Sequence, residues 1–205
     1  DRAIAMLIIF TFNILFWMFF EQAGSSFTFL ADKIVDKNIF GFAWPVAWFQ
    51  SVNSLAIIVF APIMAWLWVR LGSANPSIPR KFGLGIIFNG LAFALLMFAL
   101  TKLLNDAGMI PFWTLFMVYV IQSIGELCLS PIGLSAMTKL APRRMYGVMM
   151  GMWFLASAYG QYVAGQLGAS MALPNKDATK LEKLQSYTDG YGQLAIYAVI
   201  CAVLM

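Results

Sequence analysis

The feature that most constrains this chain is a succession of long apolar stretches separated by short polar segments. A helix of about 20 residues crosses the hydrocarbon core of a bilayer, where every backbone amide must find its hydrogen bond within the protein. The expected membrane spans cover residues 3–30, 45–69, 82–100, 111–138 and 146–171, followed by a shortened span at 191–205. The sequence therefore predicts an all-α integral membrane protein, a six-helix bundle whose last helix is truncated.

The composition agrees with a chain that lies in a membrane. It is 61% hydrophobic, 16% aromatic and only 11% charged, whereas soluble domains carry about 25% charged residues. Histidine is absent, and both cysteines, Cys128 and Cys201, lie inside apolar stretches without metal-ligand spacing. We therefore expect no metal and no cofactor. The net charge of +4 comes from residues between the spans, so the expected surroundings are membrane lipids and not nucleic acid.

The basic residues between the spans indicate an orientation. One set of alternate loops holds every arginine, and its Lys and Arg residues are Arg2, Arg70, Arg80, Lys81, Lys139, Arg143 and Arg144. The other set holds only lysines, which are matched by six acidic residues. Because cytoplasmic loops carry an excess of Lys and Arg, we expect the arginine-rich loops in the cytoplasm. Compact loops without an N-x-S/T glycosylation signal (x not proline) fit a bacterial inner membrane.

Two glutamates, Glu21 and Glu126, lie in the middle of expected spans. A carboxylate at bilayer depth costs several kcal/mol unless it is paired, protonated or beside water, and such residues commonly mark a proton or substrate pathway. No Lys or Arg lies at mid-span in this chain. A static buried salt bridge, the structural alternative, would therefore need a cation from another part of the protein.

Other polar residues recur at helical spacing around these glutamates. The stripes are Asn13, Trp17, Glu21 and Ser25; Gln50, Asn53 and Ser54; Gln122, Glu126 and Ser130; and Trp153, Ser157 and Gln161. Residues four apart share a helix face, so four spans present polar faces, whereas the third span presents almost none. This pattern predicts helices around a polar cavity with the third span at the periphery. The alternative for any one Ser, Asn or Gln is a hydrogen bond that only joins two helices.

Four segments resemble the proton-dependent oligopeptide transporters (POT/PTR) of the major facilitator superfamily. The segment FWMFFEQAGSS at 16–26 resembles the seventh helix of that family, and FQSVN at 49–53 resembles the eighth. The most specific segment, GELCLSPIGLSAMTKLAP at 125–142, is similar to the tenth helix, and residues 147–160 are similar to the eleventh. The resemblance implies that residues 1–205 form the C-terminal half, helices 7–12, of a twelve-helix transporter.

The resemblance also implies roles for three polar residues. Glu21 matches the seventh-helix acid that receives a peptide amino terminus and pairs with an arginine of the other half. Glu126 matches the tenth-helix acid that pairs with a lysine of the fourth helix. Both are therefore proton-coupling candidates. Asn53 matches an asparagine that hydrogen-bonds the peptide, although Ser54 stands where many members of the family have proline.

Four further positions are implied as walls of the peptide site: Trp17, Trp153, Phe154 and Ser157. The implied function is proton-coupled symport of di- and tripeptides, with the N-terminal six-helix half as partner. The alternatives are a major facilitator for another small substrate (nitrate, a drug or an amino-acid-like compound) and a non-transporting half-transporter fragment. We do not expect an enzyme, because the chain has no histidine and its two mid-span acids lie on different spans.

Overall fold

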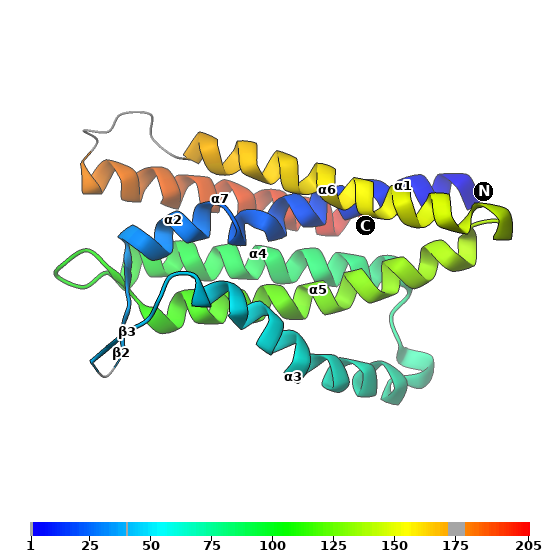
Figure 1. The fold of residues 1–205 in the computed structure, drawn as a ribbon, viewed down its shortest axis with the longest axis horizontal. Helices are drawn as coiled ribbons and strands as arrows, with labels where there is room; N and C mark the ends of the chain where they lie inside the picture. Colours follow the sequence, from blue (N-terminus) through cyan, green and yellow to red (C-terminus); the bar gives the residue numbers. More distant parts are fainter. Residues whose placement is uncertain (1, 40, 172–178) are drawn as a thin grey trace.

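The computed structural model describes residues 2–39, 41–171 and 179–205. Most of the long helices lie along one common direction and pack side by side, whereas the helix Trp48–Arg70 runs obliquely to them (Figure 1). The α-helices are α1 (Arg2–Phe20), α2 (Ser26–Lys33), α3 (Trp48–Arg70), α4 (Ile78–Lys102), α5 (Phe112–Leu140), α6 (Tyr146–Met171) and α7 (Lys180–Leu204). Short 3-10 turns are η1 (Glu21–Ala23), η2 (Gly72–Ala74) and η3 (Arg143–Met145).

The predicted fold class is confirmed. Among the described residues, four helical segments are long and apolar enough to span a membrane: Ile4–Lys33, Trp48–Arg70, Ile78–Lys102 and Phe112–Leu140. Helices α6 and α7 lie against these segments, α6 mainly on α1 and α7 mainly on α4 (Figure 1). The result is an all-α membrane bundle.

Helix α4 lies deep inside this bundle, between α5 and α7. Its contact with α5 is a close backbone approach, because a Cβ added to Gly85 would lie 2.9 Å from the carbonyl oxygen of Gly125. The apolar side chains Phe82, Ile86 and Phe93 are fully buried on its faces. The third expected span is thus well buried within the bundle, although it was expected at the periphery of a polar cavity, and the cavity described below contains no residue of α4.

The first expected span is not a regular helix throughout. Helix α1 ends at Phe20, η1 follows, and α2 begins only at Ser26. Ser25 has φ −115° and ψ −91°, outside the helical region. This interruption is stable because the carbonyl of Ala23, which a regular helix would satisfy, accepts hydrogen bonds from side chains of two other helices.

The last helix also differs from the prediction. A shortened span from residue 191 was expected, but α7 begins earlier and runs without a break from Lys180 to Leu204. Thr179 caps it, since the Thr179 hydroxyl accepts from the backbone of Glu182 while the Glu182 carboxylate accepts from the Thr179 amide at 2.7 Å. Gly190 lies inside this helix, where it allows the side chain of Met171 to pack against the α7 backbone. A Cβ at Gly190 would collide with that side chain.

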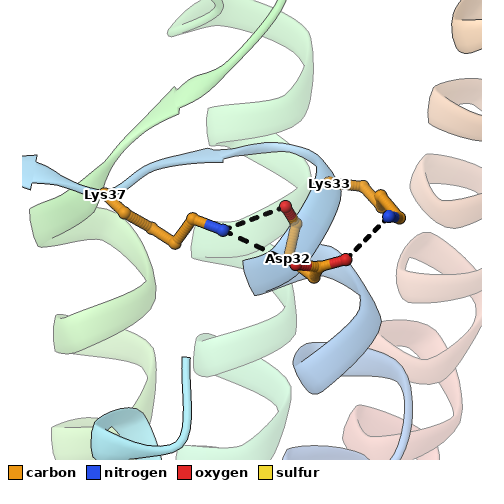
Figure 2. Close-up of polar contacts among 3 residues, drawn as sticks. All are labelled: Asp32, Lys33 and Lys37. Carbon is orange, nitrogen blue, oxygen red and sulfur yellow. Dashed lines mark hydrogen bonds and ion pairs between the residues drawn. The ribbon is translucent and has the colours of Figure 1, made fainter. Parts of the chain in front are cut away.

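The two ends of the bundle differ in charge. At one end α1, α4 and α6 begin and α3 and α5 end, and all five arginines lie in these termini and turns (Figure 1). The opposite end contains two short strand pairings, β1 (Val35–Asp36) with β4 (Ile110–Pro111) and β2 (Asn38–Ile39) with β3 (Phe42–Ala43). Here Asp32 lies between Lys33, 2.8 Å away, and Lys37, 3.6 Å away (Figure 2).

Candidate functional site

A polar cavity of about 170 Å³ opens at the interruption between α1 and α2. Its lining residues come from three parts of the bundle: Phe20, Glu21, Ala23 and Gly24 from the interruption, Gln50 and Asn53 from α3, and Tyr119 and Gln122 from α5. Helix α4 supplies none of them. The polar faces of the first, second and fourth expected spans therefore converge on one cavity, which we call the glutamate cavity.

The Glu21 carboxyl group folds back over Gly24. A Cβ built on Gly24 would lie 2.6 Å from Glu21 Oε1, so any larger side chain would occupy the space of that oxygen. Gly24 has φ −82° and ψ −13°, an ordinary right-handed conformation. It is therefore the absence of a side chain, and not an unusual backbone, that this position requires.

The helix interruption is tied to two other helices through the carbonyl oxygen of Ala23. The Tyr119 hydroxyl of α5 donates to it at 2.9 Å, and the Gln50 side-chain amide of α3 donates at 2.8 Å. On the other side, the Gln22 amide donates to the backbone of Ala164 on α6 at 3.1 Å. Since Glu21 begins this turn, these hydrogen bonds set the position of its backbone.

Asn53 joins α3 to the second glutamate. Its side-chain Nδ2 donates to Glu126 Oε2 at 3.1 Å and to Ser123 Oγ at 3.0 Å. Ser123 is fully buried, and its hydroxyl donates to the backbone oxygen of Tyr119 at 2.7 Å. Glu126 therefore lies next to the glutamate cavity and is connected to it through Asn53.

Gln122 presents an unusual polar group to the same cavity. Its side chain is only 1% exposed, and neither atom of its amide has a hydrogen-bond partner within the described part of the chain. A buried amide without partners is costly. The cavity has room for several water molecules, so water or a polar group of a ligand can satisfy Gln122.

Glu21 lines the glutamate cavity and Glu126 lies next to it, and no basic side chain is among the lining residues that the structure describes. Within the described ranges, the ion pairs join Asp32 to Lys33 and Lys37 at the end of the bundle, and none involves Glu21 or Glu126. A site of this kind favours a ligand cation, a proton or a basic side chain from a neighbouring segment.

Comparison with known proteins identifies the family. The model of the POT family matches residues 1–185. The chain belongs to the POT family. Peptide transporter YePEPT of Yersinia enterocolitica is 40% identical over 194 residues, which are 93% of this chain and 36% of that protein. Dipeptide and tripeptide permease A of Erwinia pyrifoliae is 34% identical over 192 residues, 94% of this chain and 39% of that protein.

The fold agrees with solved structures of the same family. A mutant of the peptide transporter POT, in complex with alafosfalin, matches with a TM-score of 0.86 at 35% identity, covering 99% of this chain and 39% of that chain. The chain thus spans less than two fifths of the length of these POT relatives.

The POT resemblance named four wall residues that the structure does not bring into the glutamate cavity. Trp153 is 2% exposed, and its indole fills the space above Gly133. Ser157 accepts a hydrogen bond from Asn13 at 3.1 Å, so this pair joins α6 to α1. Trp17 lies at the close α1–α6 approach beside Gly160, and Phe154 is 61% exposed on the surface of this bundle. Their roles in binding stay predictions.

Several residues of the site, among them Tyr119, Ser123 and Gly24, were not singled out from the sequence. Tyr119 and Ser123 lie on α5, and Gly24 lies in the interruption. The only signal for the first two was their spacing, since Tyr119 and Ser123 are four residues apart and Ser123 is three residues before Glu126. Gly24 lay inside the segment that resembles the seventh POT helix, but its role depends on the position of the Glu21 side chain.

Proposed function

We propose that this chain is the C-terminal half of a proton-coupled symporter of di- and tripeptides, and that Glu21, Asn53 and Glu126 form its part of the peptide site. The observation that carries the proposal is the glutamate cavity, which Glu21 lines and which Asn53 connects to Glu126, while neither glutamate has a basic partner among the described residues. The names of the POT relatives, peptide transporter and dipeptide and tripeptide permease, support the substrate class.

The chemistry of peptides suits such a cavity. Peptides of different sequence share an ammonium group, a carboxylate and backbone amides. A site that tolerates many side chains therefore binds the termini by charge. Glu21 and Glu126 provide the negative charge for an ammonium group, and the side-chain amide of Asn53 on α3 donates a hydrogen bond to the Glu126 carboxylate. The positive charge for the peptide carboxylate comes from the N-terminal six-helix half.

Proton coupling uses the same carboxyl groups. When the two halves are together, a basic residue of the N-terminal half pairs with a glutamate, and protonation of that glutamate releases the pair. A change of one such ion pair shifts an equilibrium between two conformations by about 1–3 kcal/mol. Binding near the midplane between two halves is suited to alternating access by rocking of one half against the other.

The charge difference between the two ends supports an orientation. All five arginines lie at one end of the bundle, in the termini and turns of α1 to α6. We place this end in the cytoplasm and the protein in a bacterial inner membrane. Attachment of a membrane-impermeant thiol reagent to cysteines introduced at Ser73 and at Asn105, in intact cells, tests this assignment, with labelling from outside expected only at Asn105.

The function is tested by uptake of labelled dialanine into liposomes that contain the full-length transporter. An inward proton gradient is expected to drive uptake, and Glu21→Gln and Glu126→Gln are each expected to abolish the gradient-driven part. Glu182→Gln, which makes the same chemical change at an exposed position on α7, is the matched control and is expected to keep full uptake. Folded protein without any dipeptide uptake would contradict the peptide assignment. Normal gradient-driven uptake by both Glu21→Gln and Glu126→Gln would show that the two glutamates have only a structural role.

A further inference from the structure

The hydrogen bonds around Glu126 form a chain with a fixed direction. The Ser123 hydroxyl has one hydrogen, and it is donated to the backbone oxygen of Tyr119. The Ser123 oxygen can therefore only accept from Asn53. The Asn53 amide nitrogen has two hydrogens, one donated to Ser123 Oγ at 3.0 Å and the other to Glu126 Oε2 at 3.1 Å.

The reversed orientation of the Asn53 amide is disfavoured by Ser123. If the amide were turned over, its oxygen would face the Ser123 oxygen and the Glu126 carboxylate, and two pairs of acceptors would meet without a hydrogen. Ser123 is fully buried, so water cannot readily replace the lost bond. Without the Ser123 hydroxyl, Asn53 would keep only the Glu126 carboxylate to distinguish its two orientations.

We propose that Ser123 is a positioning residue of the transport site, which acts through Asn53 to hold a hydrogen-bond donor against the Glu126 carboxylate. This inference rests on the proposed function, because it assumes that Glu126 takes part in transport. Ser123 itself does not touch the ligand. Its hydroxyl is held by the α5 backbone, and α5 also carries Glu126, so the two groups that accept from the Asn53 amide lie on one helix.

The first test is a double-mutant cycle on dipeptide uptake by the full-length transporter. Ser123→Ala is expected to lower kcat/KM about threefold to tenfold, the effect of one lost hydrogen bond, and Ser123→Thr, which keeps the hydroxyl, is expected to restore it. In an Asn53→Leu background, Ser123→Ala is expected to have almost no further effect. Ser135→Ala, at an exposed position on the same helix, is the control and is expected to behave like the wild type.

The opposite results are equally clear. Wild-type kinetics in Ser123→Ala would overturn the inference, and so would the same fold-loss in the Asn53→Leu background, since that loss would come from the α5 helix and not from Asn53. If the wild type takes up no dipeptide, the proposed function fails, and the inference is then decided by nuclear magnetic resonance of the side-chain amides.

In the second test, the Asn53 amide resonance is assigned by its absence in Asn53→Leu. The Ser123→Ala change is expected to shift this resonance and to speed its hydrogen exchange, whereas Ser135→Ala leaves it in place. An Asn53 resonance that is unchanged in Ser123→Ala would overturn the inference regardless of any transport result.

Discussion

Replacement of Gly24 by alanine tests whether the position of the Glu21 carboxyl group matters for transport. The new Cβ would lie 2.6 Å from Glu21 Oε1, whereas ordinary contacts begin at 3.4 Å. The carboxyl oxygen must therefore move by about 0.8 Å, the difference between these two distances. It can move, because it is the end of a flexible side chain beside a cavity and not a backbone atom.

The structure predicts a small effect of Gly24→Ala on folding stability and a large effect on transport. Gly24 has helical dihedral angles that alanine also adopts, and such a replacement alone stabilises a protein by about 0.4–1 kcal/mol, which offsets part of the cost of the contact. The unfolding free energy should therefore change by less than about 1 kcal/mol. A misplacement of about 1 Å in a functional site can reduce activity by as much as 10²-fold, so we expect kcat/KM for dialanine to fall about tenfold or more.

The assay pairs proton-driven dialanine uptake with chemical unfolding of the same full-length protein. The control is Gly165→Ala on α6. A Cβ at Gly165 would have no atom of the residues that the structure describes within 4 Å, so this variant should leave uptake unchanged. Wild-type kcat/KM in Gly24→Ala would refute the reasoning, because the carboxyl group would then act equally well from a displaced position. A large loss of stability would also refute it, since the cost would then lie in the fold.

Two further predictions concern the interruption and the start of α7. Tyr119→Phe removes the hydroxyl that donates to Ala23 and is expected to lower the unfolding free energy by about 0.5–1.5 kcal/mol; an unchanged denaturant midpoint would show that the bond contributes nothing. The hydrogen bonds from Thr179 hold the pKa of Glu182 below its ordinary value of 4.5. Its stabilising effect should therefore be complete above pH 4.5 and fade as the pH falls through the lowered pKa. Amide exchange in the first turn of α7 should be slower in the wild type than in Glu182→Gln above pH 4.5, and the two should converge once the pH has fallen below the lowered pKa. A difference that stays constant with pH would contradict the capping role.

The sequence predicted the membrane bundle because length and hydropathy alone decide what can span a bilayer. It also indicated the two glutamates, since a carboxylate at bilayer depth is costly wherever the helix faces. Spacing placed Gln122 and Glu126 on one helix face. This face meets Asn53 of α3 because of the way the two helices pack. Spacing along one helix gives no information about that packing.

The polar stripe of α1 shows the same limit. Asn13 and Glu21 share a stripe, yet Asn13 donates to Trp153 and Ser157 of α6, while Glu21 lies in the cavity. The helix is interrupted between Asn13 and the end of this stripe, and the interruption is held by Tyr119 and Gln50, which are distant in sequence. Periodicity predicts a polar face but not the partner that the face meets.

A structure of the full-length transporter with bound dialanine would test the two-glutamate site most directly. The proposed function predicts that the ammonium nitrogen of the peptide lies within hydrogen-bond distance, about 2.6–3.2 Å, of a carboxylate oxygen of Glu21 or Glu126, with Asn53 beside it. A peptide bound with its ammonium group away from both carboxylates would contradict the proposal.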